Sequence, residues 1–322
     1  MSLTTIDTNN YAEMAKAMGI SEEATTSSKS KSTLARLKIN HSPIMGTAEV
    51  NKKKVNVEVV EGGTYKLELP DTDQAYFSPE ISIRPYMQRF MHKRFVKGTG
   101  DTKNSFVKTV MADTLNIDLK DNSGKFNCGK PAGYIEDFKA LPEDMQNLIR
   151  QIKRVRVVFG TVQMVDSVDV QGEPVDVGEV PFIWEVDNRE AFKTMGAPFQ
   201  TLFQNKRLPV QHRINATTSV RKLPNGNSYY VPDVELDMSD TINIEESDQT
   251  MFASFLDWIT NYNEYILSSW SDNNRHGNEL NSAWDLPDDQ ALNIVEEFVN
   301  IESTVEAVSY THLRAHETDS YL

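Results

Sequence analysis

The sequence predicts an α+β protein, in which a β-rich body with one internal helix is followed by acidic C-terminal helices. Two observations favour this class. Between residues 34 and 240, apolar and polar residues alternate in about eight short segments separated by turn signals, as in strands with one buried face. After residue 240 the apolar spacing becomes helical. Short strands joined by hairpin turns indicate a small barrel or sandwich rather than a doubly wound sheet.

The first half of the body contains four predicted strands. They cover residues 34–39, 54–60, 65–69 and 81–90. Gly62 and Gly63 lie between the second and third strands and suit the backbone angles of a tight turn, so we expect these strands to form a hairpin. Residues 106–119 show no decisive period, and residues 121–134 are rich in turn formers.

The second half of the body opens with the internal helix, residues 141–153. Pro142 fits its first position, and four apolar side chains form one stripe. Further strands are predicted at 153–165 and 181–186. Residues 216–238 predict a hairpin, because Asn225-Gly226 supplies the positive backbone angles of a two-residue turn.

The domain prediction follows this pattern. A flexible arm with a short amphipathic helix precedes the body, and acidic helices at 248–270 and 288–304 follow it. The four parts are the arm at 1–33, the β-rich nucleic-acid-binding body at 34–240, the acidic helical segment at 241–306 and a tail at 307–322.

The tail does not resemble natural protein sequence. Residues 308–318, VSYTHLRAHET, match the translation of a transposase-type sequencing-library adapter, and Tyr321-Leu322 match its continuation past a variable index. We therefore expect residues 307–322 to be adapter-derived and leave them out of the fold prediction. On this interpretation the natural protein continues beyond Glu306.

Charge is divided along the chain, although the formal total is -14. Residues 29–160 carry 23 Lys and Arg against 15 Asp and Glu, whereas residues 233–306 carry 1 against 18. A cationic body followed by an acidic segment is typical of a protein that binds a polyanion. The alternative is that the acidic helices only keep the protein soluble.

A cationic and aromatic stretch, residues 81–97, provides the candidate binding site. Bases of a single strand stack on aromatic rings, while Lys and Arg neutralise the phosphates. In a regular strand Arg84, Tyr86, Gln88 and Phe90 share one face. The predicted nucleic-acid-binding residues of this strand, of a neighbouring strand and of the later hairpin are Arg84, Tyr86, Arg89, Phe90, Lys93, Arg94, Lys153, Arg154, Arg156, Arg221, Lys222 and Tyr229. In the alternative interpretation the rings are core residues and the cations lie at a strand edge.

The sequence favours a protein without catalytic residues, cofactor or bound metal. It lacks a phosphate-binding loop, a zinc-protease motif and a serine-hydrolase motif. Asp233, Glu235 and Asp237 would project from one face of a strand, as the metal ligands of a nuclease do. The lysine of such nucleases is replaced here by Asp237, so a metal-dependent nuclease is the least favoured alternative.

The expected compartment is the cytoplasm. The chain has one cysteine, Cys128, no signal peptide and no apolar run of membrane-spanning length. We therefore predict a reducing setting without membrane association. Cys128 has no neighbouring histidine, so we expect a buried, inert thiol.

Three segments resemble phage proteins identified as single-stranded DNA-binding proteins. They are IRPYMQRFMHKRF (83–95), KFNCGKPAGYIEDFKALPEDMQNLIRQIKRVRVVFG (125–160) and RKLPNGNSYYVP (221–232). With the acidic helix, the resemblance spans residues 81–270. It implies an OB-like fold, no catalysis, and a role in phage DNA replication or recombination in the cytoplasm of the infected cell.

The predicted function is sequence-independent binding of single-stranded DNA, with an affinity that falls steeply as salt rises. We expect the acidic segment, 233–306, to occupy the binding groove in the absence of DNA. When DNA displaces it, the segment becomes available to replication or recombination proteins. The alternative function is that of a phage virion structural or assembly protein, whose β-rich domain binds other proteins.

Overall fold

The computed structural model describes residues 34–278, except 51–52, 71, 73, 99–102 and 225. The described residues belong to one compact unit. The predicted N-terminal arm, the helix expected at 288–304 and the adapter-like tail lie outside the described residues. Within the described part, no helix is long and apolar enough to cross a membrane.

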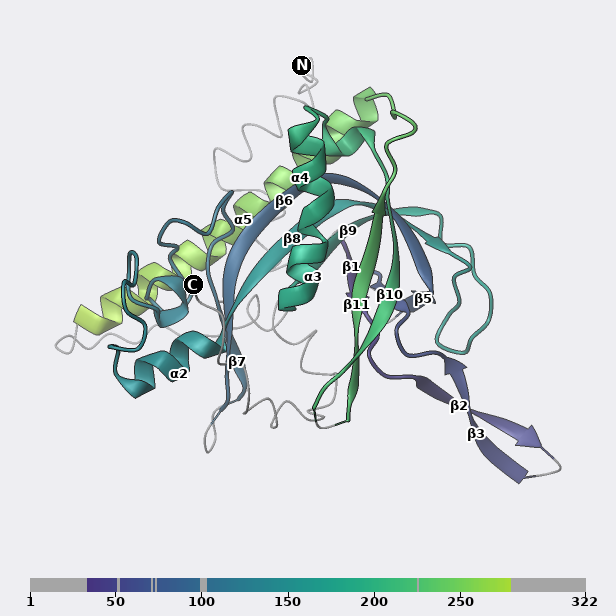
Figure 1. Ribbon diagram of the computed structural model, residues 1–322, viewed down its shortest axis with the longest axis horizontal. Helices are drawn as coiled ribbons and strands as arrows, with labels where there is room; N and C mark the ends of the chain where they lie inside the picture. Colours follow the sequence, from purple (N-terminus) through teal and green to yellow (C-terminus); the bar gives the residue numbers. More distant parts are fainter. Residues whose placement is uncertain are drawn as a thin grey trace, which may run out of the picture. The chain divides into compact units, whose positions relative to one another are not determined.

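Nine of the described strands form one sheet (Figure 1). They are β1 (Ala35–Ile39), β4 (Tyr65–Glu68), β5 (Ala75–Ser78), β6 (Glu80–Val96), β7 (Ser105–Lys108), β8 (Ile152–Val165), β9 (Glu179–Val186), β10 (Ile214–Lys222) and β11 (Ser228–Leu236). The order across the sheet is β11-β10-β6-β8-β9-β1-β4-β5, and β7 also pairs with β6. β1 and β9 run parallel, whereas β6 and β8 at the centre run antiparallel.

This architecture confirms a mixed α+β protein with a large β-sheet body. The described strands do not close into a barrel, because β11 and β5 end the sheet on opposite sides. The long strands β6 and β8 follow the period-two segments of the sequence. The hairpin of β10 and β11 also forms as predicted, although its loop, closed by the Leu223 N–H and the Asn227 carbonyl at 2.7 Å, is longer than two residues.

A separate two-stranded sheet, β2 (Ile44–Val50) and β3 (Lys53–Val60), projects from the body (Figure 1). The predicted hairpin of β3 with β4 is wrong, since β3 pairs with β2 and β4 pairs with β1. The turn at Gly63 closes onto β1 instead. Its φ is +93°, and its N–H donates to the Asn40 carbonyl at 2.6 Å.

The described part of the chain contains two helices that the sequence did not predict. The helices of this part are α2 (Glu143–Gln151), α3 (Arg189–Thr194), α4 (Gly196–Gln204) and α5 (Glu246–Asn278), with short 3-10 helices η2 (Asn127–Gly129) and η3 (Pro209–Gln211). α2 is the predicted internal helix, and α5 extends the predicted acidic helix. α3 and α4 have no counterpart in the prediction.

α3 and α4 cover one face of the sheet, and α5 covers the other. Val158 of β8 lies in a buried core with Met195 and Phe199 from the region of α3 and α4. Phe159, the next residue of β8, points the opposite way because strand side chains alternate. Its ring packs on Phe255 of α5, with 5.8 Å between the ring centroids. We name the two surfaces the α3–α4 face and the α5 face.

Candidate nucleic-acid interface

A β-bulge in β6 divides the predicted binding strand between the two faces. The register with β8 shifts directly after Pro85, so Tyr86 is the extra residue. The alternation therefore reverses, and Arg84 and Tyr86 point toward α5 while Phe90 lies on the α3–α4 face. The single face expected for these side chains is not formed. Gly160 permits the close approach at this point, because a Cβ there would lie 2.3 Å from the Arg84 carbonyl oxygen.

On the α5 face, Asp248 of α5 holds Arg84 and Tyr86. Both terminal nitrogens of Arg84 donate to the carboxylate at 2.8 Å, and the Tyr86 hydroxyl donates to it as well. Tyr86 is 8% exposed, and its ring packs on Phe255. Burial and the hydrogen bond to Asp248 raise the pKa of Tyr86 to about 12. In this arrangement Tyr86 offers no open ring surface to a base.

Lys93 and Lys108 share the carboxylate of Glu185, and the nitrogen–oxygen distances are both 3.2 Å. The two lysine side chains are only 6% and 7% exposed. Burial alone would raise the pKa of Glu185, but the charges of Lys108 and Lys93 outweigh it and hold this pKa well below its usual range. Lys93 therefore belongs to a buried ion-pair cluster.

The other predicted cations come from β6, β8 and β10. Three of them pair with carboxylates: Arg89 with Asp113 at 3.1 Å, Lys153 with Asp187 at 3.1 Å and Arg221 with Glu190 at 2.8 Å. Arg94 donates to the Cys128 carbonyl at 3.0 Å. Arg154 and Lys222 are exposed, and Tyr229 is half-buried. Most of the predicted cations thus have a partner within the protein.

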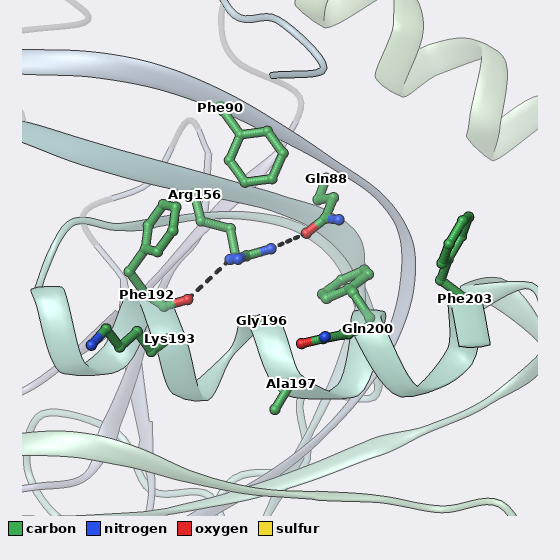
Figure 2. A pocket seen from close by; sticks show the side chains of 10 residues that line it. Gln88, Phe90, Arg156, Phe192, Lys193, Gly196, Ala197, Gln200 and Phe203 are labelled. Atoms are coloured by element: carbon green, nitrogen blue, oxygen red, sulfur yellow. Dashed lines mark hydrogen bonds between the residues drawn. The ribbon is translucent and has the colours of Figure 1, made fainter. Parts of the chain in front are cut away.

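Arg156 is the predicted cation that lies inward on the α3–α4 face. Its guanidinium carbon is 5.0 Å from the ring centroid of Phe90 and 4.6 Å from that of Phe192. Its Nε donates to the Phe192 carbonyl at 3.2 Å, and a terminal nitrogen donates to the side-chain oxygen of Gln88 (Figure 2). Burial lowers the pKa of Arg156 to about 10, which leaves it charged at neutral pH.

Beside this cation lies a pocket of about 550 Å³ between the sheet and α3 and α4. Phe192 and Phe203 stand at opposite ends of the pocket, with Gln88 and Gln200 between them (Figure 2). Phe203 is 84% exposed, and Lys193 adds a second cation to the lining. The pocket therefore combines open aromatic surface, positive charge and side-chain amides.

Two local features place α3 and α4 against the sheet. The side-chain oxygen of Asn188 caps α3, because it accepts hydrogen bonds from the backbone N–H groups of Glu190 at 2.9 Å and Ala191 at 3.1 Å. Gly196 begins α4, and a Cβ there would lie 2.5 Å from a terminal nitrogen of Arg156. The missing side chain leaves the space that the guanidinium occupies.

Sequence reasoning identified Phe90 and Arg156 but missed the pocket residues on the two helices. The missed residues that could contact a ligand are Phe192, Lys193, Gln200 and Phe203. A signal was present: Asn188 is a favoured capping residue, and Phe192, Met195, Phe199 and Leu202 follow with helical spacing.

The candidate metal ligands of the nuclease alternative do not meet in a metal site. Among the described residues, no three His, Cys, Asp or Glu side chains are grouped closely enough to hold a metal ion. Asp237 instead accepts hydrogen bonds from the Ser239 hydroxyl at 2.6 Å and backbone N–H at 2.9 Å, which lower its pKa. Cys128 is buried, as predicted, and burial raises the pKa of its thiol.

Comparisons with known proteins add no relatives to this picture. No protein-family model matches the chain, and neither the curated proteins nor the solved structures contain a match. The chemistry of the pocket is therefore the basis for a functional proposal.

Proposed function

We propose that this protein binds single-stranded DNA, largely independently of sequence, through the pocket on the α3–α4 face. The observation that carries the proposal is the grouping of an exposed ring, Phe203, with the cations Arg156 and Lys193 around one pocket. Bases stack on aromatic rings and phosphates are neutralised by cations, so this combination suits a single strand.

Exposed cations on the α3–α4 face suggest where the DNA runs. Arg154 is exposed and lies two residues before Arg156 on β8, so the two side chains share a face. In this proposal Arg154 and Lys193 neutralise phosphates toward the Phe192 end of the pocket, while a base stacks on Phe203 at the other end (Figure 2). Phe90 and Arg156 form the floor of the pocket. The strand crosses an open sheet and two helices, so binding does not require the OB-like barrel that the resemblance implies.

The acidic segment has a second role in this proposal. Asp248 forms an ion pair with Arg84 and accepts a hydrogen bond from Tyr86, so α5 covers these side chains and keeps DNA away from the α5 face. The resemblance to phage single-stranded DNA-binding proteins supports a role in DNA replication or recombination in the cytoplasm of an infected cell. Replication or recombination proteins are then the partners proposed for the acidic segment, 233–306.

The test is a fluorescence-anisotropy titration of labelled oligo(dT) at two salt concentrations, with the matching duplex as competitor. We expect tight binding to the single strand that weakens as salt rises. Phe203→Ala should weaken it by about fivefold or more, since stacking contributes about 1–3 kcal/mol per base. Tyr134→Ala is the matched control, because Tyr134 is 89% exposed and lies outside the pocket lining. Absence of binding at low salt would refute the proposal.

One observation favours the second candidate function, a phage virion assembly protein. The β2–β3 hairpin projects from the body, and it exposes Met45 by 55% and Val55 by 45% (Figure 1). Exposed apolar side chains on a projecting hairpin suit contact with another protein. This alternative predicts stable oligomers in light scattering that dissociate in Met45→Asp, together with no salt-sensitive affinity for oligo(dT).

A further inference from the structure

We infer that the pocket selects bases by their carbonyl oxygens, so that thymine is held more tightly than adenine. This inference rests on the proposed function and adds a modest preference to binding that tolerates any strand. The selecting residue is Gln88, whose side-chain amide lies between Phe192 and Phe203 (Figure 2).

The amide of Gln88 can be oriented in only one way. A guanidinium has donors and no acceptor, so the atom that meets Arg156 must be the amide oxygen. The amide nitrogen therefore lies on the side away from Arg156 (Figure 2). Among the described residues, no hydrogen bond is formed by this nitrogen, so its N–H groups are available to a ligand in the pocket.

The surrounding cations extend this donor character. Arg156 and Lys193 carry only donors, because neither a guanidinium nor an ammonium group can accept a hydrogen bond. Gln200 is exposed and can turn either end of its amide toward a ligand. Beside the Gln88 amide nitrogen, Arg156 thus presents donors without acceptors, and Lys193 adds a donor at the Phe192 end of the pocket (Figure 2).

Thymine and adenine differ in what they present to these donors. Thymine carries two carbonyl oxygens, which accept hydrogen bonds. Adenine has acceptor ring nitrogens, but its exocyclic amino group donates and lies directly beside them. A glutamine normally recognises adenine with its oxygen and nitrogen together. At Gln88 the oxygen faces Arg156, which uses one of its two lone pairs, so bidentate pairing with adenine competes with this contact. A base held by the amide nitrogen alone places the amino group of adenine near the donors of Arg156.

Phe203 does not contribute to the choice. Every base has a π-face, so stacking on an exposed ring is tolerant of sequence. The preference should therefore follow the Gln88 amide, while the total affinity follows Phe203.

The experiment compares the affinities of oligo(dT) and oligo(dA) for the full chain and for Gln88→Glu. The substitution keeps an oxygen for Arg156 and replaces the outward donor with an acceptor. We expect the ratio of the dT affinity to the dA affinity to fall about three- to tenfold, the range for one hydrogen bond. Because oligo(dA) stacks on itself, only the change in the ratio is interpreted. Gln171→Glu, an exposed glutamine outside the pocket lining, controls for the added charge.

A second measurement does not depend on how the variant folds. The unaltered chain is titrated with an oligonucleotide in which difluorotoluene, a thymine isostere without carbonyl oxygens, replaces thymine. We expect a similar three- to tenfold loss of affinity. Equal affinity for the two oligonucleotides, or an unchanged dT to dA ratio in Gln88→Glu, would overturn the inference and leave the proposed function intact. Failure to bind any of these strands would instead remove the proposed function.

Discussion

On the α5 face Arg84 and Lys93 lie against carboxylates, whereas on the α3–α4 face Arg156 contacts two aromatic rings. Arg84 and Lys93 come from β6, and Arg156 comes from β8, which pairs with β6 in the sheet. Asp248 and Glu185 neutralise Arg84 and Lys93, whose side chains are only 12% and 6% exposed. Arg156 borders an open pocket with an exposed ring.

The difference shows how two paired strands can place their cations in two different environments. Arg84 and Lys93 are compensated by carboxylates, since an unpaired buried charge is strongly unfavourable. Arg156 is buried as well, but its partners are the Gln88 amide, the Phe192 carbonyl and two ring faces, which stabilise the cation without neutralising its charge. The α5 face therefore stabilises the fold, and the α3–α4 face supplies the binding chemistry.

The largest expected effect is on the α5 face. Asp248→Ala should lower the free energy of unfolding by about 3–5 kcal/mol, because Arg84 is left buried without its carboxylate. Glu190→Ala is the matched control, since its pair with Arg221 is about 40% exposed and should contribute less than about 1 kcal/mol. Urea denaturation at neutral pH measures both. Similar small losses in the two variants would mean that the Arg84–Asp248 pair does not stabilise α5.

A buried histidine of β6 should make the free energy of unfolding depend on pH in a higher range than the ion pairs do. His92 is 7% exposed, and burial, with the charges of Lys130 and Arg154, lowers its pKa to about 4. The unfolded state binds a proton near pH 6.5 and the folded state does not, so stability is full above that pH. It should fall by on the order of 3 kcal/mol as the pH drops toward 4.

The carboxylates titrate in a lower window. The pKa values of Asp248 and Glu185 are held below their usual range, so their contribution is lost only below about pH 4. His92→Gln should therefore make the free energy of unfolding nearly independent of pH between 6.5 and 4. The loss of stability below about pH 4, which comes from the carboxylates, should remain. Urea midpoints across this range provide the measurement. A wild-type profile that is flat above pH 4 would contradict the assignment of His92.

A smaller loss of stability is expected at Gly196, where α4 packs against Arg156 of the pocket. Gly196→Ala forces the Arg156 guanidinium to move, so we expect a loss of about 1–3 kcal/mol in stability. The affinity for oligo(dT) should fall as well, because Arg156 helps to hold Gln88. Ala253→Ser, at an exposed helical position of α5 outside the pocket lining, should change neither quantity appreciably. Thermal unfolding and anisotropy together check this prediction.

The smallest stability effect is expected at Phe203. Because this ring is 84% exposed, Phe203→Ala should change the free energy of unfolding by less than about 0.5 kcal/mol while DNA affinity falls. Asp248→Ala should show the opposite combination in any fraction that remains folded. Loss of stability in Phe203→Ala without loss of affinity would contradict the division between the two faces.

The sequence predicts most strands because alternation is a local property. The bulge at Tyr86 was harder to predict from the sequence. Pro85 is a signal for it, since proline within a strand is found mainly at edges and bulges. That one residue decided which side chains share a face. The partner of Arg84 is 164 residues away along the chain, and no local pattern links the two. Phe192 and Phe203 enter the site only because α3 and α4 fold back onto β8.

The central claim is that a single strand lies on the α3–α4 face. Oligo(dT) containing 5-iododeoxyuridine, which forms photo-crosslinks to nearby aromatic side chains, tests this claim when the adducts are mapped by mass spectrometry. We predict adducts at Phe203, with further adducts at Phe90 or Phe192. Adducts confined to Tyr229 or to other rings outside the pocket would contradict the account.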